Sequence, residues 1–90
     1  MSTAAERLAS FSCGLSDEQI PPSVQGAAKL HLLDTLGCGL AAHALDTAPA
    51  PREAMVELGE GGPATAIGVD TGMSPSAAAL VNGATCHALD

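Results

Sequence analysis

The sequence has almost no aromatic side chains: among its 90 residues Phe11 is the only one, and there is no tryptophan or tyrosine. Aromatic side chains bury the largest apolar areas, and the free energy gained by burial scales with that area. The hydrophobic fraction is nevertheless 47%, and much of it is alanine, which buries little area. The composition therefore favours close packing of small residues and predicts a weak core for an isolated chain of this length.

Basic residues are also scarce. Three lysines and arginines face ten aspartates and glutamates, which gives a net charge of −7. The three basic residues, Arg7, Lys29 and Arg52, are far apart in the sequence. A surface that binds nucleic acid or an anionic membrane needs clustered positive charge. We therefore expect neither nucleic acid nor a membrane as a partner.

No segment has the features of a membrane span or of a secretory signal. The most apolar stretch, residues 26–45, contains Lys29, His31 and Asp34, and a spanning helix would not carry all three. Residues 1–11 lack the basic start and apolar centre of a signal peptide. We expect a soluble protein of the cytoplasm.

Cysteine is sparse and unpaired in the sequence. Cys13, Cys38 and Cys86 are widely spaced, and no two of them form a CxxC motif. Zinc cages and redox motifs usually need such pairs. The simplest interpretation is three buried, free thiols in a reducing compartment.

Capping residues and apolar spacing predict helices at both ends of the chain. Thr3 and Glu6 have the spacing of a capping box, which predicts a helix over residues 4–13 with Leu8 and Phe11 facing inward. At the other end, a cap at Ser74 followed by Pro75 predicts a helix over 76–90.

The middle of the chain is expected to contain a long helix and two shorter segments. Apolar residues on most faces of 23–44 predict a helix that is buried on most sides. Gly37 and Gly39 weaken such a helix, and their presence predicts a close crossing by another helix. A short helix is expected at 52–58, and a lone extended run at 64–69.

One face of the last helix gathers polar groups. His87 and Asp90 are three residues apart and share that face, and Gly83, one turn earlier, leaves room for a ligand or a crossing backbone. Asn82 beside them offers a donor and an acceptor. One histidine and one aspartate are too few for a metal site. By spacing alone, a solvated helix end is the simpler interpretation and a binding site is the alternative.

His31 and Asp34 repeat the same spacing within the long helix. There we expect a structural role, with Asp34 as a buried hydrogen-bonding group. His43 lies near the C-terminal end of the helix, where a histidine suits the helix dipole. No nucleophilic triad can be assembled from these residues.

Five segments together resemble one family, the MmgE/PrpD family of 2-methylcitrate dehydratases and cis-aconitate decarboxylases, in its N-terminal region. The more specific of them are LLDTLGCGLA and VNG-x-x-x-H-x-x-D. The segments are LASF at 8–11, IPPSV at 20–24, AAKLHLLDTLGCGLA at 27–41, ATAIG at 64–68 and AALVNGATCHALD at 78–90.

The resemblance implies an all-α fold, as the N-terminal part of the family's helical domain, with one short extended segment near 64–69. Complete members add a smaller α+β domain, are usually homodimers, and need no metal or organic cofactor. They act next to a carboxylate on small di- or tricarboxylates by eliminating water, losing carbon dioxide or epimerising. The dehydratase reaction is our first expectation, and decarboxylase and epimerase reactions are the alternatives.

The resemblance also assigns site residues. Asp90 matches the first aspartate of the family's Asp-Phe-Asp-Asp pattern and is expected to be catalytic. His87 is expected to support it or line the site, and Asn82 and Gly83 to bind substrate or support the site. The family's other catalytic groups, including its lysines, follow later in the pattern.

These matches predict that residues 1–90 are a partial helical domain, cut within a helix at the C-terminal end, and inactive by themselves. A different class of function stays open: a non-catalytic helical module that binds a full-length relative through its apolar helix faces. Which acid would be the substrate is not readable from these residues.

Overall fold

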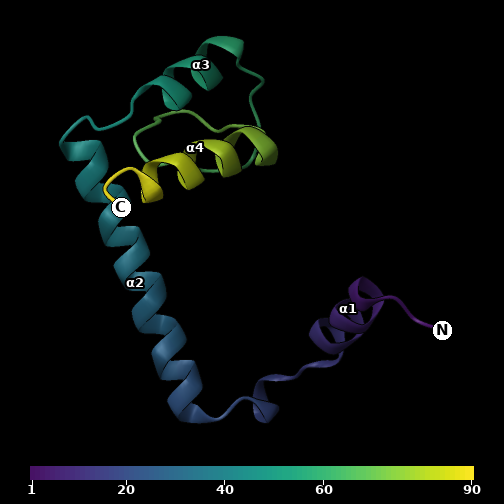
Figure 1. The fold of residues 1–90 in the computed structure, drawn as a ribbon. Helices are drawn as coiled ribbons and strands as arrows, with labels where there is room; N and C mark the ends of the chain where they lie inside the picture. Colours follow the sequence, from purple (N-terminus) through teal and green to yellow (C-terminus); the bar gives the residue numbers. More distant parts are fainter. The chain divides into compact units, whose positions relative to one another are not determined.

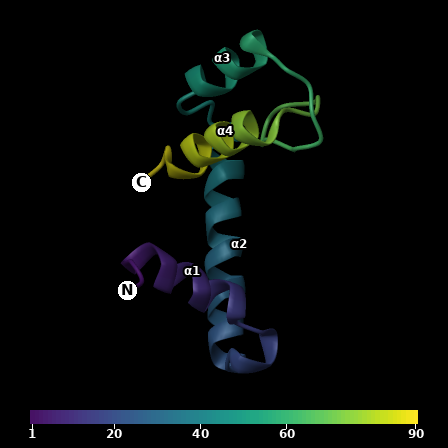
Figure 2. The same cartoon turned by 90° about the vertical axis from the view of Figure 1, so that its right-hand side faces the viewer.

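The computed structural model describes residues 1–90 and is mostly helical (Figures 1 and 2). It contains no strand, and its one β-bridge joins Ala64 to Met73. The all-α prediction is therefore confirmed. The helices are α1 (Ala4–Gly14), the 3₁₀ helix η1 (Asp17–Gln19), α2 (Pro22–Ala44), α3 (Ala50–Leu58) and α4 (Pro75–His87).

The chain divides into two compact units, Met1–His31 and Leu32–Asp90. Helix α2 therefore contributes its first part to one unit and its second part to the other. None of the helices combines the length and the apolar character that a membrane span needs.

The first unit begins with the capping box that the sequence predicts. The Thr3 hydroxyl accepts a hydrogen bond from the Glu6 amide at 3.1 Å, and the Glu6 carboxylate accepts one from the Thr3 amide at 2.7 Å. Both bonds satisfy amides that the first turn of a helix leaves unpaired. After Gly14, the Gln25 side chain donates to the backbone oxygens of Asp17 and Ile20, each at 3.0 Å, and joins η1 to the start of α2.

The inward orientation expected for Leu8 and Phe11 is wrong. Their exposed fractions are 68% and 65%, and α1 contains no buried residue. An apolar stripe is buried only against a second element, and no residue between positions 1 and 31 is buried. The spacing thus identifies the helix but not a surface that covers it.

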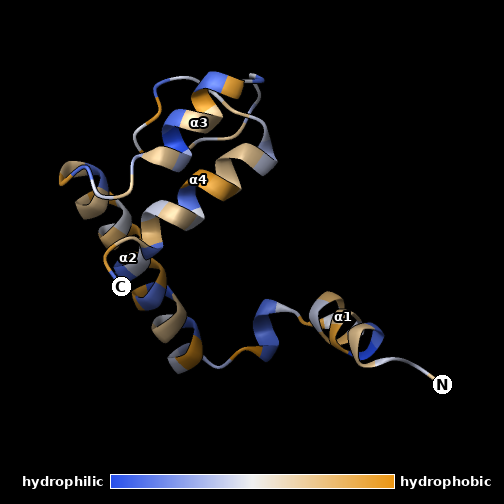
Figure 3. Ribbon diagram, turned by 45° about the horizontal axis from the view of Figure 1, so that its top comes forward, coloured by the Kyte–Doolittle hydropathy of each residue, from blue (hydrophilic) through white to orange (hydrophobic).

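The extent of α2 agrees with the predicted helix, but its predicted burial is wrong. Only Gly39 and Ala42 are buried, and hydrophobic residues recur along the exposed helix (Figure 3). Both buried residues lie in the C-terminal half of α2, which belongs to the second unit. The large exposed apolar residues of α2 are Val24, Leu30, Leu32, Leu33, Leu36 and Leu40.

The close crossing expected at the two α2 glycines is present at one of them. A Cβ atom added to Gly39 would lie 2.6 Å from Ile67 Cδ1 and 2.9 Å from the Cys86 sulfur, so α4 passes directly over this residue. Gly37 has nothing within 4 Å of the same position. The prediction is confirmed for Gly39 and wrong for Gly37.

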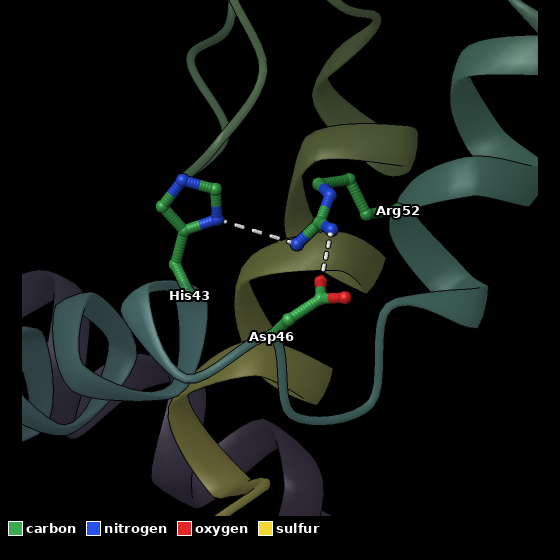
Figure 4. A network of polar contacts seen from close by, with 3 residues as sticks. All are labelled: His43, Asp46 and Arg52. Atoms are coloured by element: carbon green, nitrogen blue, oxygen red, sulfur yellow. Dashed lines mark hydrogen bonds and ion pairs between the residues drawn. The ribbon is translucent and has the colours of Figure 1, made fainter.

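Helix α2 ends in a Schellman-type cap. Asp46 adopts a left-handed conformation with φ of 51°, the Thr47 amide donates to the Ala42 oxygen at 2.9 Å, and the Asp46 amide donates to the His43 oxygen at 3.0 Å. The side chains then join two helices: Arg52 of α3 contacts Asp46 at 3.0 Å and the His43 ring nitrogen at 3.3 Å (Figure 4). His43 occupies the last turn, as predicted.

The core of the second unit lies between α3 and α4, which run side by side (Figures 1 and 2). The loop between them folds back through the Ala64–Met73 bridge, with backbone hydrogen bonds of 3.0 and 2.9 Å. The predicted extended run is thus one bridge and not a strand, and α3 begins two residues before its predicted start. The buried cluster is Ala66, Met73, Ala78 and Val81, small residues of the kind that the composition favours.

Helix α4 starts as predicted but ends earlier. The Ser74 hydroxyl accepts from the Ala77 amide at 3.3 Å, and Pro75 occupies the first turn. The helix predicted over 76–90 ends at His87, and residues 88 and 89 form a turn. Bonds between residues three apart tighten this end, including one from the Asp90 amide to the His87 oxygen at 3.0 Å.

Candidate functional site

An open hollow of about 240 Å³ lies where the second part of α2 meets the C-terminal end of α4. Both helices belong to the second unit at this point. The α4 residues that line it follow helical spacing, so one face of α4 forms one wall. The lining residues are Asp34, Thr35, Cys38, Gly83, Cys86, His87 and Asp90.

The side chains of His87 and Asp90 contact each other at this hollow. The distance from His87 Nδ1 to Asp90 Oδ2 is 3.2 Å, and the side chains are 81% and 65% exposed. The shared face that the sequence predicts is therefore present. Carboxylate and imidazole groups both form hydrogen bonds with ligands, so the pair offers these two groups to a bound molecule.

Gly83 keeps the wall of the hollow open beside this pair. A Cβ atom added there would meet nothing within 4 Å. The room that the sequence predicts is therefore unfilled, and no crossing backbone occupies it. Position 83 accordingly has space for a ligand next to His87.

Asn82 does not line the hollow. Its side-chain oxygen accepts from the Ile67 amide at 2.8 Å, and its side-chain nitrogen donates to the Thr65 oxygen at 2.9 Å. Both ends of the amide thus hold residues 65–67 against α4. Because Ile67 also lies against Gly39 of α2, Asn82 helps to set the α2–α4 crossing from which the hollow is built.

Asp34 lies at the hollow, and the burial expected for it is wrong. The residue is exposed and lines the α2 wall. Asp34 is thus a site residue that the sequence does not predict, and so are Thr35, Cys38 and Cys86. The sequence predicts a crossing at Gly39, but it does not show which α4 residue lies opposite. Only the structure identifies that residue as Cys86.

The cysteines differ from the expectation of buried thiols. Cys13 is exposed, Cys38 and Cys86 are partly exposed, and all three are free. The last two line the hollow.

The lining of the hollow is acidic. Its lining includes two carboxylates, one imidazole, two thiols and one hydroxyl, and neither lysine nor arginine. The structure contains no group of three or more histidine, cysteine or acidic side chains arranged to hold a metal ion. An anionic ligand bound here would need positive groups from outside this lining.

The sequence model of the MmgE/PrpD N-terminal domain matches residues 6–90. The chain belongs to the MmgE/PrpD family. The match includes all of α2 and α4, and hence every residue that lines the hollow. No curated protein and no solved structure matches the chain. The hollow is thus a feature of an MmgE/PrpD N-terminal domain, and its chemistry has to be argued from its own residues.

Proposed function

We propose that this MmgE/PrpD domain supplies one wall of the active site of a lyase that acts on a small di- or tricarboxylate. The reaction we favour is the elimination of water in the manner of a 2-methylcitrate dehydratase, with Asp90 as the catalytic carboxylate. The observation that carries this proposal is the Asp90–His87 pair, 3.2 Å apart at an open hollow within the family match.

The chemistry needs a base beside a carbon that carries a carboxylate. The base takes a proton from that carbon, the C–H pair of electrons forms a double bond, and the neighbouring hydroxyl leaves as water once an acid has protonated it. Asp90 is 65% exposed at the hollow, and a carboxylate is a group that can accept the proton. The contact with His87 orients the carboxylate, and the space at Gly83 admits the substrate.

The substrate's own carboxylates need partners that the hollow does not contain. Lysine or arginine side chains would bind them and would stabilise the negative charge of the transition state. We infer that the complete site takes these groups from other parts of the full-length enzyme. By resemblance to the family, that enzyme is expected to be a cytoplasmic homodimer that uses neither a metal nor an organic cofactor.

Two related reactions are alternatives within the same site. A cis-aconitate decarboxylase-like enzyme would release carbon dioxide, and an epimerase would return the proton to the opposite face. All three reactions develop negative charge on a carbon next to a carboxylate. Asp90 and its neighbours can take part in the proton transfers of each reaction. The product formed from each acid distinguishes them.

A non-catalytic role is the alternative of a different class. The observation that favours it is the exposed apolar surface of the chain, with Leu8, Phe11 and the leucines of α2 uncovered. Such faces could bind a full-length relative. Stable binding to a relative, together with no effect of Asp90 on any turnover, would favour this role over the enzymatic one.

The test joins residues 1–90 to the remainder of an active MmgE/PrpD enzyme and measures turnover of 2-methylcitrate. We expect Asp90→Ala to lower kcat by roughly 100-fold to 10,000-fold, the usual contribution of a positioned acid or base. Asp70→Asn is the matched control, because Asp70 is exposed and does not line the hollow. Unchanged turnover in the Asp90 variant would contradict the catalytic role.

A further inference from the structure

Two thiols lie in the hollow, and the elimination reaction gives neither of them a task. Cys38 belongs to α2 and Cys86 to α4, and both line the hollow. Both are partly exposed and free, so small reagents in water can reach them. Cys13 provides an internal comparison, because it is exposed on α1 and does not line the hollow.

The α2–α4 crossing brings these two cysteines together. The Cα atom of Cys86 lies 3.9 Å, and its sulfur 2.9 Å, from where a Cβ atom on Gly39 would be. Gly39 directly follows Cys38 in the sequence. The backbones of the two helices therefore approach closely beside both cysteines. A disulfide needs roughly 4.4–6.8 Å between Cα atoms, and a crossing at glycine is the arrangement that gives two helices such short separations.

We propose that Cys38 and Cys86 form an oxidant-sensitive thiol pair that closes to a disulfide across the hollow. With a peroxide as oxidant, one thiolate attacks an oxygen atom, the O–O bond breaks, and a sulfenic acid and hydroxide result. The second thiolate then attacks the sulfenic sulfur, and the S–O bond breaks as the S–S bond forms. In total, two thiols lose two hydrogen atoms and the peroxide is reduced to two water molecules.

The disulfide would link the two walls of the hollow next to His87. It would fix α2 to α4 and remove the two thiols from the space that a ligand would enter. A thiol reductant would reverse it. The inference depends on the crossing at Gly39 and on the lining residues, and not on the proposed lyase activity, so a failure of one leaves the other standing.

The experiment oxidises the purified chain with hydrogen peroxide and identifies the disulfide by peptide mapping without reductant. Cys13 and Cys38 are 25 positions apart, and Cys38 and Cys86 are 48 apart. In urea, the shorter loop should therefore close about threefold more readily, which favours Cys13–Cys38. In the folded chain we expect the order to be reversed, with Cys38–Cys86 in excess by about tenfold because the fold holds the pair together.

Cysteine variants test the Cys38–Cys86 pairing without peptide mapping. Cys13→Ser should keep the Cys38–Cys86 disulfide, whereas Cys38→Ser or Cys86→Ser should each leave only a slower pairing with Cys13 in the folded chain. In the Cys13→Ser variant only one pairing is possible, and its rate in buffer should exceed its rate in urea by about tenfold. Identical maps in buffer and urea, or equal rates in the Cys13→Ser variant, would overturn the proposal.

Discussion

At the scale of single residues, the polar side chains of α4 and of the turn after it have two kinds of role. Asn82 uses both ends of its amide to hold the backbone at Thr65 and Ile67. The Asp90 side chain is 65% exposed and contacts its neighbour His87. We therefore expect Asn82 to act on the fold, and Asp90 to be available for a bound molecule.

Replacing these two residues should separate stability from function. Asn82→Ala leaves a backbone amide and a backbone oxygen without their partner, so it should lower the free energy of unfolding by about 1–3 kcal/mol. Asp90→Asn removes only an exposed ion pair and should change that free energy by less than about 0.5 kcal/mol. Urea unfolding followed by circular dichroism compares the two. Equal losses in both variants would contradict this division of roles.

The sequence predicts the His87–Asp90 pair because both residues lie on one helix, three positions apart. Local spacing fixes such a contact. It does not predict Asp34, Cys38 or Cys86 as parts of the same hollow. These residues meet only because α4 crosses α2, and a contact between residues about 50 positions apart leaves no periodic pattern in the sequence.

At the scale of the elements, helix starts are predicted well and burial is predicted poorly. The starts of α1 and α4 depend on caps at Thr3 and Ser74, which are interactions within four residues. The burial expected for α2 depends on elements that would cover it, and apolar spacing does not identify them. The end of α4 is predicted three residues too late, at residue 90 and not at His87. No capping glycine follows His87 to mark this end in the sequence.

The two glycines of α2 provide a matched test of the α2–α4 crossing. Each alanine substitution gains about 1 kcal/mol of helix propensity. At Gly37 the new methyl group meets open space, whereas at Gly39 it would overlap Ile67 and Cys86. We expect Gly39→Ala to be less stable than Gly37→Ala by about 1–3 kcal/mol, the usual cost of overpacking.

Thermal or urea unfolding of the two variants in parallel measures this difference. The comparison cancels the propensity gain, which is common to both. If Gly39→Ala were as stable as Gly37→Ala, α4 would not cross α2 at this residue, and the hollow would lose its structural basis.

At the scale of the whole molecule, the chain buries little. Three of its six buried side chains belong to alanine, and large apolar residues on α1 and α2 stay exposed. This agrees with the shortage of aromatic residues in the sequence. The family membership shows where such a chain belongs, as the N-terminal domain of an MmgE/PrpD protein. In our proposal, surfaces and positive groups from the rest of that protein complete both the core and the site.

The central claim is that Asp90 takes a proton from the carbon next to a substrate carboxylate. The most direct test is to incubate the chimeric enzyme with 2-methylcitrate in heavy water and to measure deuterium at that carbon by mass spectrometry or NMR. With Asp90 present, we expect exchange or elimination at a rate that Asp90→Asn lowers by roughly 100-fold or more. Exchange that proceeds equally fast in the Asp90→Asn variant would show that another group is the base, and would contradict the claim.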